Sequence, residues 1–144
     1  MNAEREVKSC GVILFRQVDG KEFLLLRRPD RYDFAKGHVE RGETELQCAL
    51  RELEEETGVP PHHVQLDPTF RFTLQYPVWD KYIRARARKT LVLFLGWLQQ
   101  PRDLVVSEHE DYEWRPWQPP HRIQQQTIDP ALAALAEFWQ QASA

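Results

Sequence analysis

This sequence of 144 residues has few cysteines, no long apolar run and no large excess of positive or negative charge. The two cysteines, Cys10 and Cys48, each lie inside an apolar pattern, where a free thiol usually behaves as a small buried hydrophobe. We therefore expect neither a disulfide nor a zinc site. No apolar run approaches the ~20 residues that cross a bilayer, and the polar N-terminus lacks the apolar core of a signal peptide. We expect a soluble, cytoplasmic protein.

The charges of the chain nearly cancel. The 19 Lys and Arg residues stand against 22 Asp and Glu residues, so the formal net charge is −3. No global field recruits nucleic acid or a membrane, and any affinity for phosphate must come from a local arrangement. At 42% hydrophobic residues, the chain is long enough for one full core and too short for two domains. We expect a single domain over residues 1–144.

Strand and turn signals open the chain. Residues 10–18 and 23–27 are rich in Val, Ile, Leu and Phe, and they flank Asp19-Gly20, a dipeptide that readily takes the positive φ angles of a tight hairpin. Residues 29–41 lack sustained periodicity, which indicates a loop with a short strand near residues 37–39. Further strands are predicted at 70–74, 83–97 and 112–117. The continuous apolar run at 91–95 predicts that the second of these is central.

The strongest helix signal begins after the loop. Thr44 and Gln47 have the spacing of a capping box, and Gly58, followed by two prolines, supplies a stop. The helix is predicted over residues 45–57. Its apolar stripe, at helical spacing, is expected to comprise Leu46, Ala49, Leu50 and Leu53.

A second helix is predicted near the C-terminus. Asp129-Pro130 pairs a capping residue with a proline at the first helical position, and apolar residues recur at helical spacing through residues 131–141. Strands interrupted by one helix and closed by another predict an α/β fold, with a mixed β-sheet sandwiched between α-helices.

Glutamates crowd the last turns of the first helix, where the helix dipole is negative and favours cations. At 100° per residue, Glu52, Glu55 and Glu56 lie within an arc of about 100° beside the apolar stripe, whereas Glu54 should face solvent. Their repulsion costs about 0.2–0.5 kcal/mol per pair, and a hard cation would reverse its sign. Carboxylates suit Mg²⁺ or Mn²⁺ together with phosphate oxygens. The cluster predicts a metal site for a polyphosphate; the alternative is a solvated charged face.

The glutamates belong to a longer motif that begins before the helix. Gly37, Glu43 and the run Arg51-Glu52-Leu53-Glu54-Glu55-Glu56-Thr57-Gly58-Val59 fit G-x5-E-x7-R-E-U-x-E-E-x-G-U, where U is a bulky aliphatic residue. This sequence resembles the Nudix hydrolases, with the box at residues 37–59. The resemblance implies that Glu52, Glu55 and Glu56 bind metal and that Glu43 orients Arg51, which steadies the acids. Gly37, which lacks a Cβ, lets the loop backbone approach the metal or a phosphate closely.

Within that family, nearly the whole chain is similar to the asymmetrical diadenosine tetraphosphate hydrolases. The likeness rests on the order of short segments at residues 10–16, 23–26, 36–40, 89–90 and 108–109, with Tyr112 and Trp114. It implies that Glu108 is a further metal ligand or the general base. The substrate contacts that it implies are Lys36, His38, Tyr76, Lys89 and Tyr112. His38 and Lys89 would contact phosphates, and the tyrosines would hold an adenine.

Basic residues gather on the predicted strand at 83–97. Arg84, Arg86 and Arg88 alternate and should share one face, while Lys81 and Lys89 fall on the other. A polyphosphate could use either face, and the alternative is that these are solvated strand residues. The chain also departs from its relatives before the box, where they commonly carry a tryptophan and a proline: residues 32–36 read Tyr-Asp-Phe-Ala-Lys.

The predicted reaction is asymmetric hydrolysis of diadenosine tetraphosphate to ATP and AMP with Mg²⁺, or Mn²⁺, as cofactor. Other pyrophosphatase substrates remain open: triphosphorylated RNA 5′ ends, modified nucleoside triphosphates and diphosphoinositol phosphates. A function of another class would be a nucleotide-binding module without turnover, against which the complete acid set argues. The expected partner is a small nucleoside polyphosphate, with no membrane and no obligate protein partner.

Overall fold

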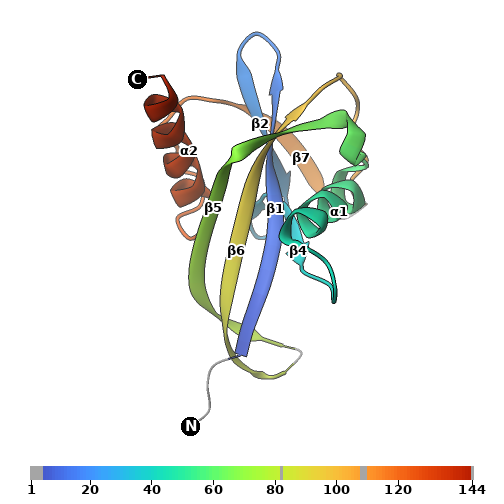
Figure 1. Cartoon of the computed structure of the whole chain (residues 1–144), viewed down its shortest axis with the longest axis vertical. Coiled ribbons are helices and arrows are strands. Elements are labelled where there is room, and N and C mark those ends of the chain that lie inside the picture. The colour runs from blue at the N-terminus through green and yellow to red at the C-terminus, as the bar shows by residue number, and fades with distance from the viewer. Residues whose placement is uncertain (1–4, 82, 108–109, 144) are drawn as a thin grey trace.

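The computed structural model describes residues 5–81, 83–107 and 110–143. The elements follow in the order β1 (Arg5–Gln17), β2 (Lys21–Arg27), β3 (Tyr32–Asp33), β4 (Ala35–His38), α1 (Glu45–Thr57), η1 (Pro61–His63), β5 (Val64–Asp80), β6 (Ala85–Leu98), β7 (Asp111–Pro116) and α2 (Ile128–Ala142). Figure 1 shows the long strands β1, β5 and β6 side by side, with α1 and α2 on opposite sides.

The strands form one mixed sheet in the order β3-β2-β1-β6-β5, while β4 pairs with β1 and β7 pairs with β2. The β1–β6 pairing is parallel and the other pairings are antiparallel. The predicted α/β fold, a mixed sheet between helices, is confirmed. Because β1 pairs with β2 near Phe15 and with β4 near Gly11, the loop that carries the box is anchored to the middle of the sheet.

Alternate residues of the central strands fill two cores, one on each face of the sheet. Leu91, Leu93 and Leu95 belong to the core beneath α2, which we call the α2 core. Val92 belongs to the core beneath α1, the α1 core. A strand that is buried on both faces reads as a continuous apolar run. The predicted central position of the 91–95 segment is therefore confirmed.

Local signals set the first hairpin and the first helix as predicted. Asp19 and Gly20 have positive φ angles of 46° and 115° in the turn between β1 and β2. Thr44 accepts a hydrogen bond from the Gln47 backbone N–H, and the Gln47 side chain accepts one from Thr44. Gly58 ends α1 in the left-handed conformation, at a φ of 77°. Each of these signals lies within a few residues of the feature that it controls.

The predicted apolar stripe of α1 is wrong in part. The buried residues of α1 are Cys48, Ala49, Leu53 and Thr57, whereas Leu46 is 38% exposed. The helix packs against β1 and β4, and the Cys48 thiol points at the Gly37 carbonyl of β4. The sheet therefore selects a helix face rotated toward Cys48, which periodicity alone did not identify.

The predicted cap of the second helix is also wrong. α2 begins at Ile128, and Thr127 at the N-cap makes no side-chain capping bond. The Gln124 side chain instead accepts from the backbone N–H groups of Thr127 and Ile128. Asp129, inside the first turn, accepts from two backbone N–H groups of the preceding loop. A loop side chain therefore caps the helix, and a helix side chain binds the backbone of the loop.

Strand β5 is much longer than the predicted segment at 70–74. It pairs with β6 through Asp80, with a register shift between Asp67 and Arg71. Its alternation of exposed and half-buried residues gave little apolar signal. Arg84 has a φ of 53° and precedes β6, so Arg86 and Arg88 alone share the predicted strand face.

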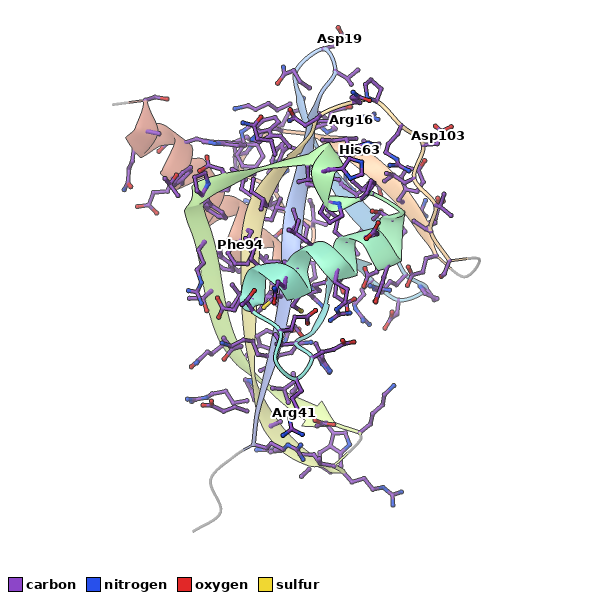
Figure 2. The ribbon with its side chains drawn as sticks, turned by 45° about the vertical axis from the view of Figure 1, so that its right-hand side comes forward. Arg16, Asp19, Arg41, His63, Phe94 and Asp103 are labelled. Atoms are coloured by element: carbon purple, nitrogen blue, oxygen red, sulfur yellow. The ribbon has the colours of Figure 1, made fainter. Side chains whose placement is uncertain are left out.

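The far ends of the three long strands project beyond both helices (Figure 1). We call this projection the arm and define it as residues 5–8, 75–81 and 85–90. The turn at Asp19 lies at the opposite end of the sheet (Figure 2). Among the described residues, no helix is long and apolar enough to span a membrane.

Leu53→Ala should lower the free energy of unfolding by about 2–5 kcal/mol, because the Leu53 side chain is fully buried and its truncation leaves a cavity. Leu46→Ala, on the exposed side of the same helix, should change it by less than about 1 kcal/mol. Chemical denaturation followed by circular dichroism measures both. Equal losses would contradict the observed orientation of α1.

Candidate active site

Arg51 joins the helix to the loop that precedes it. Its Nε and Nη2 donate to the two carboxylate oxygens of Glu43 at 2.6 and 2.9 Å, and Nη2 also donates to the His38 carbonyl at 3.0 Å. Its Nη1 donates to Glu52 at 2.8 Å and to Glu55 at 3.2 Å. The hydrogen bond from Arg51 lowers the pKa of Glu43 to about 2. The predicted contacts of Arg51 with Glu43 and with the acids are present.

Gly37 lies directly against the acidic helix. A Cβ built at Gly37 would fall 2.1 Å from Cδ of Glu52, so any side chain there would displace the carboxylate. The Cys48 thiol donates to the Gly37 carbonyl at 3.3 Å and fixes this approach. Both cysteines are free and buried, as predicted, and burial raises the pKa of Cys10 to about 12. The close approach expected of Gly37 is thus made to a carboxylate of the box.

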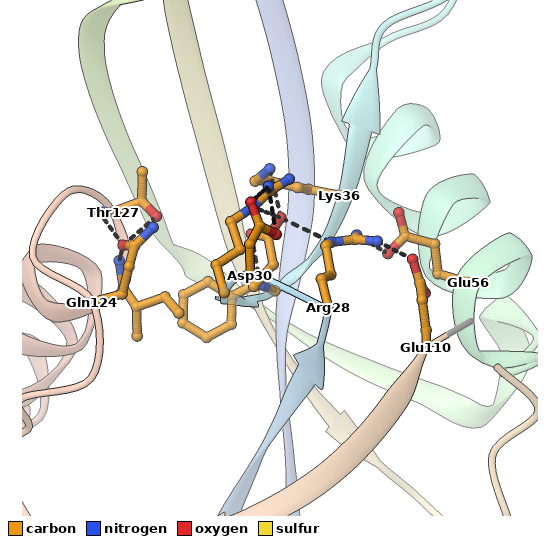
Figure 3. Close-up of polar contacts among 11 residues, drawn as sticks. Arg28, Asp30, Lys36, Glu56, Glu110, Gln124 and Thr127 are labelled. Atoms are coloured by element: carbon orange, nitrogen blue, oxygen red, sulfur yellow. Dashed lines mark hydrogen bonds and ion pairs between the residues drawn. The ribbon is translucent and has the colours of Figure 1, made fainter. Parts of the chain in front are cut away.

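A second arginine, Arg28, holds the other end of the cluster. Its guanidinium lies beside Glu56, with Nη2 at 3.4 Å from Oε2, and Nη1 pairs with Glu110 (Figure 3). Burial raises the pKa of Glu56 to about 8, although the positive charge of Arg28 opposes the shift. Glu56 is therefore a poorly solvated carboxylate, and a nearby cation stabilises its charged form.

Asp33 connects Arg28 to the sheet. Its side chain is 4% exposed, and Oδ2 accepts from Lys36 at 3.0 Å and from Arg28 Nε at 3.4 Å. Its Oδ1 accepts the Phe34 backbone N–H at 2.9 Å. This aspartate belongs to residues 32–36, the segment that we expected to differ from the family pattern. Charged side chains consequently run without a break from Lys36 on β4 to Glu56 on α1.

Three of the predicted substrate contacts come together. Lys36 and His38 lie on β4, and His38 and Lys89 line the same cavity. Burial, followed by the charge of Lys36, lowers the pKa of Lys89 to about 8. Burial, followed by the charge of Lys89, lowers the pKa of His38. Burial is the largest cause of both shifts, the neighbouring lysine is the second, and a bound anion would oppose both.

The two tyrosines are not brought together. Tyr76 packs against the α2 core, while Tyr112 packs against the α1 core. The sheet lies between these two cores, so the structure does not place the two rings together, and the predicted adenine contacts of Tyr76 and Tyr112 stay predictions. Glu108, predicted to be a further metal ligand or the general base, lies outside the described residues.

Glu52, Glu55 and Glu56, which the helical wheel placed within one arc, contact two different arginines. Arg51 binds Glu52 and Glu55, whereas Arg28 binds Glu56. Within the described residues, no three acidic, His or Cys side chains gather closely enough to hold a metal ion. Glu52 and Glu56 are mostly buried, while Glu55 is 56% exposed and Glu54 faces solvent as predicted.

The donor set nevertheless fits a divalent cation. Glu52 and Glu56 offer carboxylate oxygens, and Gly37, in contact with Glu52, offers a carbonyl oxygen. Hard oxygen donors of this kind suit Mg²⁺ or Mn²⁺. For a cation to bind there, Arg51 and Arg28 must yield part of their contacts to it.

Arg28, Asp33 and Glu110 are site residues that sequence reasoning missed. Arg28 follows an apolar strand, and Asp33 lies in a loop without periodicity, so neither carries a helical or strand pattern. The expected difference from the family pattern at residues 32–36 was the one signal that pointed toward Asp33. The pairing of Arg28 with Glu56 spans 28 positions and has no local signature.

Asp33→Asn should lower the free energy of unfolding by about 2–4 kcal/mol, because it leaves the mostly buried Arg28 and Lys36 without their shared carboxylate. Asp30→Asn is the matched control, since Asp30 is 73% exposed and pairs only at the surface with Arg31; it should change stability by less than about 0.5 kcal/mol. Thermal and urea unfolding measure both. A stable Asp33→Asn variant would contradict the bridging role.

Comparisons with known proteins identify the family to which the chain belongs. The family model of the NUDIX domain matches residues 6–138. The asymmetrical bis(5′-nucleosyl)-tetraphosphatase of Sus scrofa is 36% identical, and the match covers 75% of this chain and 78% of the relative. The protein of the same description from Caenorhabditis elegans is 34% identical with the same coverage.

Solved structures give the same result. A crystal structure of a C. elegans Ap4A hydrolase binary complex superposes with a TM-score of 0.80 at 28% identity, covering 93% of this chain and 98% of that one. A MutT protein from Methanosarcina mazei, 18% identical, shares the fold with a TM-score of 0.75 and covers 97% and 99% of the two chains. With a complete box and a family match over most of its length, the chain belongs to the Nudix family.

Proposed function

We propose that the chain is a divalent-metal-dependent pyrophosphohydrolase that cleaves diadenosine tetraphosphate (Ap4A) asymmetrically to ATP and AMP. The observation that carries this proposal is the position of the acidic helix directly beside the cationic group of Lys36, His38 and Lys89. The acids suit a cation, and the cationic group suits a polyphosphate. The relatives described as asymmetrical tetraphosphatases support the choice of substrate.

In this proposal, Glu52, Glu56 and the Gly37 carbonyl would hold Mg²⁺, and Glu55 and Glu108 would complete the acidic set. When bound, the cation neutralises charge on the phosphoryl oxygens. No change of fold is needed, because the loop and helix that carry these groups are already joined by Arg51.

The chain's own side chains have separate tasks. Arg51 holds the carboxylates of Glu52 and Glu55 in place. Lys36 and Lys89 bind the phosphate chain and stabilise the charge that develops during phosphoryl transfer. A carboxylate of the acidic set accepts the proton of the attacking water. Glu55 is the most exposed of Glu52, Glu55 and Glu56, and it is the candidate for this role once its contact with Arg51 opens.

Hydrolysis of Ap4A with Mg²⁺ in ¹⁸O-labelled water should yield ATP and AMP, with the label in one product only. Chromatography and mass spectrometry of the products measure both the cleavage position and the phosphorus attacked. Two ADP, or intact substrate, would overturn the proposal. A substrate panel with triphosphorylated RNA, modified nucleoside triphosphates and diphosphoinositol phosphates would then identify the alternative reaction.

Glu56→Gln should lower kcat at least ~100-fold, since charge at a metal site contributes several kcal/mol to the transition state. The variant should fold normally without metal, because it removes a buried charge that desolvation disfavours. Mg²⁺ should therefore raise the Tm of the parent protein and raise that of the variant less. Glu54→Gln, on the exposed side of the same helix, is the control and should behave as the parent. Normal turnover of Glu56→Gln would place the metal elsewhere.

A further inference from the structure

The arm carries a cavity of about 330 Å³. Its lining comes from five separate segments: Val7, Arg31, His38, Val78, Trp79, Asp80, Lys81 and Lys89. We call it the arm pocket. Lys89 lies two residues from Leu91 on β6, and therefore on the same face of the sheet as the α2 core. The helices end before the arm, so this part of the face is left open (Figure 1).

The arm pocket adjoins the acidic site. His38 lines the pocket with its side chain, while its carbonyl accepts from Arg51. Lys36, whose charge lowers the pKa of Lys89, binds Asp33, which in turn binds Arg28 beside Glu56. A phosphate chain that begins at the glutamates can thus follow Lys36 and Lys89 into the pocket.

The charge of the lining favours an anionic ligand. The lining holds three cationic side chains, Arg31, Lys81 and Lys89, and one carboxylate, that of Asp80. Arg31 also pairs with Asp30 outside the pocket, so Lys89 carries most of this argument. Lys89 is half-buried, so the charged form of its ammonium group is partly desolvated and disfavoured. Phosphate oxygens would satisfy it where water reaches poorly.

The pocket lining also includes apolar and aromatic side chains. Trp79 is 66% exposed, an unusual position for so large an apolar side chain. Val7 on β1 and Val78 on β5 flank β6, since their strand partners are Lys89 and Ala87. An exposed aromatic ring beside basic side chains is the arrangement on which nucleic-acid bases stack.

We infer that the arm pocket binds the second nucleoside of the substrate, with Trp79 against the base and Lys89 at the adjoining phosphates. This inference rests on the proposed function. Ligand pockets span roughly 300–1,000 Å³, so a cavity of about 330 Å³ suits one nucleoside and not a whole dinucleotide. The phosphates then bridge the pocket and the acidic helix, and the arm selects substrates with a nucleoside at both ends.

The test compares two ligands, diadenosine tetraphosphate and adenosine 5′-tetraphosphate, both carrying methylene bridges that prevent hydrolysis. Calorimetry with Mg²⁺ measures each Kd for the parent chain and for Trp79→Ala. The variant should bind the dinucleotide about tenfold more weakly, the effect of losing one base stack, and bind the mononucleotide within about twofold of the parent. Trp79→Phe should retain most of the affinity.

Val18→Ala is the matched control, because Val18 is also exposed but lies beside the Asp19 turn at the opposite end of the sheet (Figure 2). It should change neither Kd. Equal losses for the two ligands in Trp79→Ala, or no loss for either, would overturn the inference. A parent chain that binds both ligands but leaves Ap4A intact would overturn the proposed function alone. A parent chain that binds neither ligand would overturn both.

Discussion

The acidic end of α1 is held together by two arginines, and the rest of the site depends on that pairing. Without them, carboxylates one turn apart would repel each other beside the core. Arg51 neutralises the side toward the loop and Arg28 the side toward the sheet. Because both cations come from the chain itself, the acids can be partly buried before any metal arrives. The same contacts are those that a bound cation must displace.

Arg51 and Cys48 also attach the acidic helix to the sheet. Arg51 reaches the His38 carbonyl, and the Cys48 thiol reaches that of Gly37, so α1 is attached to β4 at two neighbouring residues. β4 is in turn paired with β1 in the middle of the sheet. The glutamates therefore sit on a rigid support and not on a free loop. Such support is what a site needs when small displacements alter phosphoryl transfer.

Asp33 lies between the basic and the acidic side chains of the site. This buried carboxylate binds Lys36 on one side and Arg28 on the other, and so connects a basic surface with an acidic one. A polyphosphate bears negative charge along its length, and under the proposed function it would extend from a cation at the acidic helix to these lysines. The arm extends that basic surface past the helices, where Trp79 provides an apolar wall.

The sequence by itself determined what local interactions control. The Asp19-Gly20 turn, the Thr44 cap, the Gly58 stop and the spacing of the box follow from residues a few positions apart. Tertiary structure decided the rest: which face of α1 is buried, that the sheet separates Tyr76 from Tyr112, and that Arg28 meets Glu56. These features join residues far apart in the chain, and their energies arise from burial and charge pairing that exist only once the sheet has formed.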